Sequence, residues 1–121
     1  MTPRQLRKFM LKNRVFLHLL YRESKKDTAQ RLNYCTNVQA NCVLHILKGI
    51  ATGEIPLKKE DYAALRKTKK LGTIEQLVDK TTFRALLRNS RSEKVTFLRK
   101  VVSLFPLLLR LLFEPLDNQD V

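Results

Sequence analysis

The stretch that most restricts the fold of this chain is residues 27–57, a neutral segment between two strongly basic ones. Residues 1–26 have a net charge of +7 and residues 58–100 a net charge of +8, whereas residues 101–121 have a net charge of −2. Apolar residues in the neutral segment recur every three to four positions, the spacing of one face of an α-helix. The members of this stripe are Ala29, Leu32, Cys35, Cys42, Val43, Ile46 and Leu47. We therefore expect one long helix, over about residues 28–48, at the centre of the hydrophobic core.

The expected central helix has recognisable start and stop residues. Asp27 is a favourable N-cap, and Gly49 is the residue type that commonly follows the last turn of a helix. A phosphate-binding P-loop needs four residues between its glycines and a lysine after the second one. In the segment GIATGEIP, Gly49 and Gly53 have three residues between them, and Glu54 follows. We therefore predict a hinge at this point and no nucleotide site.

Further helices are predicted from capping boxes, in which Ser or Thr is followed three positions later by Glu or Gln. Such boxes occur at residues 2–5, 73–76 and 90–93. Together with the apolar spacing, they predict helices over residues 3–22 (one helix, or two joined near Asn13), 57–70, 73–79, from Thr81 or Thr82 to about 89, and from Ser90 to about 102.

The predicted fold class is all-α. No segment alternates apolar and polar residues with a period of two, so no strand is expected. A chain of 121 residues is long enough for one modest core. We expect a single compact bundle of five to seven helices with one long central helix, forming one basic helical domain over residues 1–116 and a short acidic tail at 117–121.

The two cysteines, Cys35 and Cys42, do not predict a disulfide. Seven positions apart on one helix, they would lie about 10 Å from each other along its axis, too far to bridge. Together with His45, they lack the closely spaced pairs on turns that structural zinc sites use. We therefore predict no metal and no cofactor. The few acidic residues mostly neighbour lysines and form no evident nucleophile–base set, so we predict no enzymatic activity.

The compartment is predicted from the cysteines and from the N-terminal residues. The apolar run VFLHLL is short and charged residues follow it, which does not fit a secretory signal. Unpaired cysteines favour a reducing compartment, so we expect an intracellular protein of the nucleus or of a virion. A mitochondrial presequence is the alternative for residues 1–22, which contain no acid and five basic residues by residue 14.

The charge is the largest departure from an ordinary composition, with 24 basic residues against 11 acidic ones, a net +13. Such an excess favours a polyanionic partner: nucleic acid, an anionic membrane surface or an acidic protein. Basic side chains that bind backbone phosphates read no base sequence, and the chain has no tryptophan for base stacking. The candidate nucleic-acid-binding residues are Arg4, Arg7, Lys8, Lys12, Arg14, Lys58, Lys59, Arg66, Lys67, Lys69, Lys70, Arg84, Arg88, Arg91, Lys94, Arg99 and Lys100.

The C-terminal run VVSLFPLLLRLLF, residues 101–113, is mainly apolar. With 13 residues it is shorter than the roughly 20 apolar residues of a membrane-spanning helix. We expect a buried terminal helix that covers the bundle. The alternatives are a helix that docks on a protein partner or on a second copy of the chain, and a segment that lies in a membrane interface. The candidate contact residues are Leu104, Phe105, Leu108, Leu111, Leu112 and Phe113.

The segment VLHILKGIATGEIPLKKEDYAALRKTKKLGTIEQLVDK resembles small basic proteins of adenovirus-like and Polinton-type (adintovirus) DNA elements. The resemblance covers about residues 35–113: a cysteine-containing helix, a hinge, a lysine-rich helix, a further basic stretch and an apolar end. The hinge is longer here, and SLFPLLLRLLF replaces a glycine-rich terminus. The resemblance implies a DNA-binding or minor core protein of a virion or element, with membrane-active ends as one option. The matching positions are Val43, Leu44, Leu47, Lys48, Gly49, Pro56 and Leu57, and residues 65–70.

The sequence as a whole predicts a non-enzymatic helical protein that binds nucleic acid, duplex DNA in the first place, through phosphate contacts. A packaging, virion-core or accessory role fits such binding. One alternative is a helical adaptor that docks on a protein through residues 101–113, as a heteromer or a homo-oligomer. The other is a protein that binds an anionic membrane surface through its basic N-terminal helix and its leucine-rich end.

Overall fold

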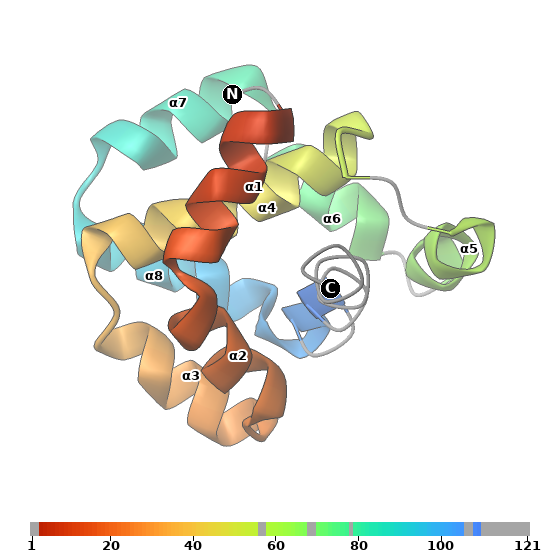
Figure 1. The fold of residues 1–121 in the computed structure, drawn as a ribbon. Coiled ribbons are helices and arrows are strands. Elements are labelled where there is room, and N and C mark those ends of the chain that lie inside the picture. Colours follow the sequence, from red (N-terminus) through yellow and green to blue (C-terminus); the bar gives the residue numbers. More distant parts are fainter. Residues whose placement is uncertain (1–2, 56–57, 68–69, 78, 106–107, 110–121) are drawn as a thin grey trace.

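The computed structural model describes residues 3–55, 58–67, 70–77, 79–105 and 108–109. These residues form eight α-helices and one short 3-10 helix, with no strand among them. The prediction of an all-α fold is confirmed, whereas the predicted number of five to seven helices is too low. The elements, shown in Figure 1, are α1 (Pro3–Lys12), α2 (Arg14–Arg22), α3 (Lys25–Asn33), α4 (Asn37–Thr52), α5 (Lys59–Lys67), α6 (Lys70–Leu77), α7 (Lys80–Arg88), α8 (Arg91–Lys100) and η1 (Val102–Leu104).

The first segment consists of two helices that meet at Asn13, one of the two arrangements predicted. The side-chain amide of Asn13 donates a hydrogen bond to the carbonyl oxygen of Phe9 over 2.9 Å. Its backbone N–H lies 3.1 Å from the carbonyl oxygen of Met10. Both carbonyls belong to the last turn of α1, where they have no partner within the helix. Asn13 therefore ends α1 by satisfying its final turn, and α2 begins at the next residue.

The single long helix expected over residues 28–48 is wrong, because two helices, α3 and α4, occupy this region. The chain leaves the helical path at Tyr34 and re-enters it after Thr36, the N-cap of α4. The Thr36 hydroxyl accepts a hydrogen bond from the Gln39 N–H at 3.1 Å, and the Gln39 side chain accepts one from the Thr36 N–H at 2.9 Å. This reciprocal pair is a complete capping box, and it fixes the start of α4 at this point.

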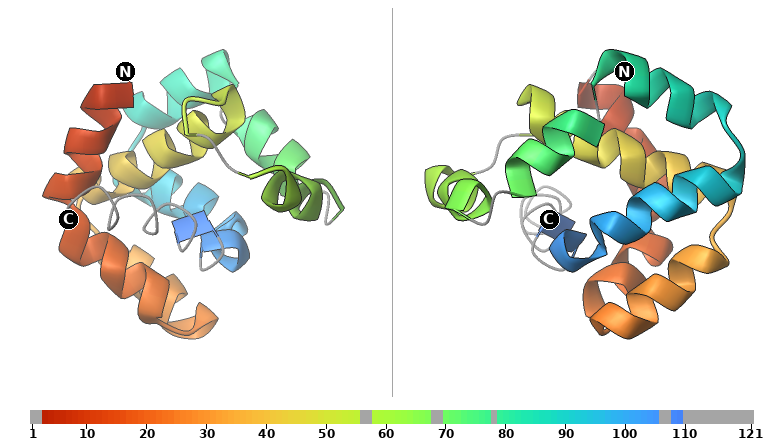
Figure 2. Two further views of the ribbon diagram at one scale, coloured as in Figure 1. Left: turned by 45° about the vertical axis from the view of Figure 1, so that its right-hand side comes forward. Right: turned by 180° about the vertical axis from the view of Figure 1, so that it is seen from behind.

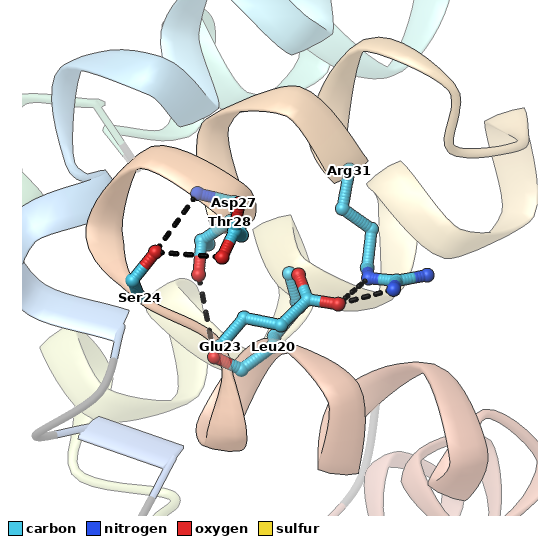
Figure 3. Close-up of polar contacts among 6 residues, drawn as sticks. All are labelled: Leu20, Glu23, Ser24, Asp27, Thr28 and Arg31. Carbon is cyan, nitrogen blue, oxygen red and sulfur yellow. Dashed lines mark hydrogen bonds and ion pairs between the residues drawn. The ribbon is translucent and has the colours of Figure 1, made fainter.

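The N-cap predicted at Asp27 is also wrong, because Ser24 caps α3. The Ser24 hydroxyl accepts a hydrogen bond from the Asp27 N–H at 3.3 Å and donates one to the Asp27 carboxylate at 2.8 Å, as Figure 3 shows. The neighbouring Thr28 is buried, and its hydroxyl lies 3.5 Å from the carbonyl oxygen of Leu20 in the last turn of α2. These contacts hold the turn between α2 and α3.

Gly49 lies inside α4, so the helix end predicted there is wrong. The helix continues to Gly53, which ends it in the left-handed conformation with a φ of 81°. Gly49 serves another purpose, because a Cβ atom there would lie 2.8–2.9 Å from side-chain carbons of Ile55 and Leu6. The Ile55 N–H also donates a hydrogen bond to the Gly49 carbonyl at 3.0 Å. The expected hinge is thus a tight return of the chain onto α4; residues 56–57 lie outside the described residues.

The later helices fall close to the predicted segments. α8 begins after Ser90, as predicted, but the capping box expected at residues 90–93 is wrong, because the Ser90 hydroxyl bonds to the Ser92 hydroxyl and makes no side-chain cap bond to the helix. α7 begins at Lys80, with Asp79 as N-cap, one residue before the predicted start. α6 departs further: it begins at Lys70, so the capping box predicted from Thr73 lies inside a helix, where N–H groups already have carbonyl partners. The inward residues of α8 are buried as expected: Val95, Leu98 and the following Val101.

Helix α4 lies in the middle of the molecule. In Figure 1, α1 lies in front of α4 and α8 lies behind it, and the rear view in Figure 2 places α8 in front. α6 also packs against α4, and α3 packs against α8. One cluster of buried apolar side chains takes members from every helix. The arrangement leaves the outer faces of α1, α7 and α8 to solvent.

The C-terminal run begins inside this core. Leu104, Phe105 and Leu108 are 4%, 1% and 1% exposed. These three predicted contact residues are therefore covered by the bundle itself and form no exposed docking face. Residues 111–113, which complete the predicted set, lie outside the described residues. None of the helices in the described ranges is long and apolar enough to cross a membrane.

Candidate nucleic-acid interface

Helices α1 and α7 are linked to α4 by a stack of three rings, one from each helix. The centroids of the Phe9 and His45 rings are 5.8 Å apart with planes at 88°, and those of His45 and Phe83 are 5.1 Å apart at 75°. Both pairs have the edge-to-face geometry that aromatic rings favour. Because Phe83 is buried, the stack holds α7 close to the N-terminal part of α1, as Figures 1 and 2 show.

The same stack positions a cation. The Lys48 ammonium lies 4.3 Å from the centroid of the Phe83 ring, within the range of a cation–π contact. Burial lowers the pKa of His45 below its ordinary value, and the positive charge of Lys48 adds to this effect. The imidazole is therefore neutral at pH 7, and Lys48 supplies the positive charge at this point.

The exposed residues of α1 and α7 include many cations and no acid. The two helices contain seven basic residues and no acidic residue, and all seven are exposed. None of the seven forms an ion pair with an acid in the described part of the chain. Their charges are therefore available to anions in solution. We name this set the α1–α7 surface; its members are Arg4, Arg7, Lys8, Lys12, Lys80, Arg84 and Arg88.

The structure brings six predicted residues together on the α1–α7 surface, and it shows two cations that the sequence reasoning missed, Lys80 and Lys48. Lys80 is the first residue of α7 and directly precedes Thr81, one of the two predicted starts of this helix. Lys48 belongs to the neutral segment, and it lies over the ring of Phe83, 35 positions further along the chain. Only the packing of α7 on α4 reveals that contact.

The other predicted residues lie elsewhere on the molecule. α5 packs against α6 and, in all three views of Figures 1 and 2, lies at the end of the molecule away from α7. Its exposed cations, and the one just before it, are Lys58, Lys59, Arg66 and Lys67. The exposed cations of α8 are Arg91, Arg99 and Lys100. Arg14 begins α2; Lys69 lies outside the described residues, and the side chain of Lys70 is likewise not described.

Lys94, predicted among the phosphate-binding residues, is buried. It is only 1% exposed, and its ammonium donates a hydrogen bond to the side-chain oxygen of Asn37 over 2.7 Å. A buried charge is tolerated where it has a polar partner. Since Asn37 is the first residue of α4, the pair joins α8 to the start of α4. Lys94 therefore belongs to the core and not to the exposed basic set.

The corner formed by α2 and α3 differs from the α1–α7 surface because it contains acids. Glu23 forms an ion pair with Arg31, whose Nε donates over 2.5 Å to the carboxylate, as Figure 3 shows. This hydrogen bond raises the pKa of Arg31. A groove of about 740 Å³ lies beside the pair, with Val15, Leu19 and Tyr34 among its lining residues. The groove thus combines apolar side chains with two acids, Glu23 and Asp27, beside its cations.

The cysteines show no sign of reactivity. Cys35 lies in the break between α3 and α4, and Cys42 lies within α4, so the expectation that they share one helix is wrong. Both are free and buried. Burial raises the pKa of Cys42 to about 12 and also raises that of Cys35. Within the described ranges, no group of three or more His, Cys, Asp or Glu side chains is placed to hold a metal ion.

Comparison with known proteins finds no match for this chain, whether against protein-family models, curated proteins or solved structures. The candidate interface is therefore described by the chemistry of its own residues.

Proposed function

We propose that this protein is a non-enzymatic nucleic-acid-binding protein that holds a duplex, DNA in the first place, against its α1–α7 surface. The observation that supports the proposal is the presence of seven exposed cations and no acid on two neighbouring helices. Lysine and arginine at such positions neutralise backbone phosphates without reading base sequence. Binding of this kind suits a packaging, virion-core or accessory role in a nucleus or a virion.

The spacing of the cations fits a phosphate backbone. Arg4, Lys8 and Lys12 recur every four residues on α1, and Arg84 and Arg88 have the same spacing on α7. Four residues correspond to about 6 Å along a helix axis. Phosphates of one DNA strand follow each other about every 3.4 Å along the duplex axis. Cations about 6 Å apart are thus close enough to contact neighbouring phosphates of a duplex.

The proposal predicts a steep dependence of affinity on salt. Each neutralised phosphate releases counterions, so six contacts give a slope of about −5 in a plot of log K against log salt concentration. The experiment is fluorescence anisotropy of a labelled duplex of about 30 base pairs, titrated with the full chain at several salt concentrations. A single-stranded oligonucleotide and an RNA duplex of the same length show which nucleic acid is preferred.

The test variant is Arg84→Ala/Arg88→Ala, and its charge-matched control is Arg22→Ala/Lys26→Ala at the α2–α3 corner. We expect the test variant to weaken duplex binding and to reduce the salt slope by about 2, one unit for each lost contact. The control removes the same charge from exposed positions outside the proposed surface and should leave the slope nearly unchanged. Equal losses in the two variants would show that only net charge matters. Weak binding of the wild type at low salt would refute the proposal.

A further inference from the structure

We propose that the protein has a second phosphate-binding face on α8 and bridges two duplexes. This inference rests on the proposed function, and it adds a second nucleic-acid partner to it. The face is a hollow of about 390 Å³ where α8 meets the end of α3. Two arginines, two hydroxyl residues, one amide and one valine line it, and none of these is acidic: Asn33, Arg91, Ser92, Val95, Thr96 and Arg99.

One of the two arginines is held in place by the protein. An Nη of Arg91 donates a hydrogen bond to the backbone carbonyl oxygen of Asn33 over 2.5 Å. A guanidinium has five N–H donors in a planar fork, so several remain for a phosphate after this contact. The carbonyl thus orients Arg91 without neutralising it. This arrangement differs from the Glu23–Arg31 pair, in which a carboxylate takes up the charge of the arginine.

The separation of the two arginines suits one strand of a duplex. Arg91 and Arg99 are eight residues apart on one helix, which corresponds to about 12 Å along its axis. Phosphates of one strand follow each other about every 3.4 Å along the duplex axis, so arginines this far apart can contact different phosphates of one duplex. The exposed Ser92 also lines the hollow, and its hydroxyl shares a hydrogen bond of 2.9 Å with the hydroxyl of Ser90. The Thr96 hydroxyl is already used, because it donates to the Ser92 carbonyl over 2.8 Å.

Helices α1 and α8 lie on opposite sides of α4. α1 and α8 both pack on α4, and Figure 1 shows α1 in front of α4 and α8 behind it. The rear view in Figure 2 brings α8 forward and places α1 behind α4. A straight duplex that lies along α1 therefore cannot also reach the α8 hollow, because α4 lies between α1 and α8. This separation holds for the α1 part of the α1–α7 surface, since α7 continues into α8 through residues 89–90. Each face is left to bind its own duplex, and one protein molecule then links the two.

The test is a capture experiment with the full chain. A biotinylated duplex of about 30 base pairs is fixed on beads, and a fluorescent duplex of equal length is added with the protein at low salt. We expect wild type to retain the fluorescent duplex on the beads. The variant Arg91→Ala/Arg99→Ala should lose about tenfold or more of this capture, while its affinity for one duplex in anisotropy changes by about threefold or less. Arg99→Glu, which leaves the Arg91–Asn33 hydrogen bond in place, should reduce capture in the same way.

The controls separate this inference from the proposed function. Arg22→Ala/Lys26→Ala removes two charges elsewhere and should capture as the wild type does, whereas Arg84→Ala/Arg88→Ala should weaken binding to a single duplex as well. If Arg91→Ala/Arg99→Ala captures normally, bridging does not use the α8 face and the inference is overturned. It is also overturned if this variant loses single-duplex affinity as strongly as Arg84→Ala/Arg88→Ala, because the two faces would then be one site. Failure of the wild type to bind any duplex shows directly in anisotropy and refutes the proposed function itself.

Discussion

The α1–α7 surface and the α2–α3 corner contain similar numbers of cations but use them differently. The corner, residues 14–33, has five basic residues and two acids, whereas α1 and α7 have seven basic residues and no acid. At the corner, Glu23 forms an ion pair with Arg31, and the Asp27 carboxylate accepts a hydrogen bond from the Ser24 hydroxyl (Figure 3). On the α1–α7 surface, none of the cations forms an ion pair with an acid of the described residues. A basic residue therefore indicates a polyanionic partner only where the fold places no acid close enough to pair with it.

The two regions are also held together by different forces. Edge-to-face rings and buried apolar side chains fix α1 and α7 on α4, so their cations are not needed for folding. The corner is fixed in part by polar contacts at the turn, where a cation and a hydroxyl take part in folding. Substitution of cations on the α1–α7 surface should therefore weaken duplex binding without lowering the free energy of unfolding. Substitution of residues that form the polar contacts at the corner should lower the free energy of unfolding.

The largest effect is expected from Phe83→Ala, which removes the ring that links α7 to α4. The ring is 3% exposed, so the substitution should lower the free energy of unfolding by about 3–5 kcal/mol. Urea denaturation followed by circular dichroism measures this loss. Val15→Ala at the corner is the control, because Val15 is 75% exposed and its loss should change stability by about 0.5 kcal/mol or less. A loss below about 1 kcal/mol for Phe83→Ala would contradict the role given to the ring stack.

The next effect is expected at Gly49, where α1 and the return of the chain approach α4 closely. Gly49→Val should lower the free energy of unfolding by about 1–3 kcal/mol, because even a Cβ atom would lie under 3 Å from Ile55 and Leu6. Gly72→Ala is the matched control in α6: its Cβ would meet nothing within 4 Å, and alanine should stabilise the helix by up to about 1 kcal/mol. If both variants are stabilised, the contact between α1 and α4 is looser than described.

A smaller effect is expected from breaking the ion pair at the corner. Glu23→Gln should lower the free energy of unfolding by about 0.2–1 kcal/mol, since the Arg31 side chain is 37% exposed and solvent screens the pair. A double-mutant cycle with Arg31→Ala isolates the interaction. Arg84→Ala/Arg88→Ala provides the contrast, because it should change stability by about 0.5 kcal/mol or less while it weakens duplex binding. Equal destabilisation by the two changes would remove the distinction between the regions.

The smallest effect is a pH dependence that arises at the ring stack. The pKa of His45 in the folded chain lies below its ordinary value of 6.5, mainly because of burial. The unfolded chain therefore binds the proton more readily, and the His45 contribution is complete above about pH 6.5 and decreases as the pH falls toward the lowered value. Thermal melting at several pH values between 5 and 7.5 should show this decrease in the wild type. His45→Gln should show a weaker dependence, and an unchanged dependence would assign it to another group.

The sequence was sufficient to predict the helical class and the buried face of α8, and it offered the junction at Asn13 as one of two arrangements. In each case a local pattern, either an apolar spacing or a cap, coincides with the tertiary arrangement. The break between α3 and α4 was also visible locally, because Thr36 and Gln39 form a capping box of the same kind as the ones that were used. It was overlooked because the apolar stripe continues on both sides of it. The spacing alone does not show where a helix stops and restarts.

The candidate site was less predictable, because it depends on residues that are distant in the chain. Lys94 looks like the surface lysines in the sequence. Only its hydrogen bond to Asn37, 57 residues earlier in the chain, shows that its ammonium has a partner inside the core. Likewise, no local pattern places α7 beside α1, so the sequence analysis treated the two basic blocks as separate. The stack of Phe9, His45 and Phe83 joins residues from three helices. Packing of this kind decides which cations form one surface.

The position of α8 has a consequence for the order in which the protein matures on the ribosome. α4 is complete by residue 52, but α8, which packs along it, begins at Arg91. Until that later segment has been synthesised and has left the exit tunnel, one apolar side of α4 lacks its native cover, and α3 lacks its partner as well. The basic helix α1 precedes both α4 and α8 in the chain, so its positive charge leaves the tunnel before the core can close.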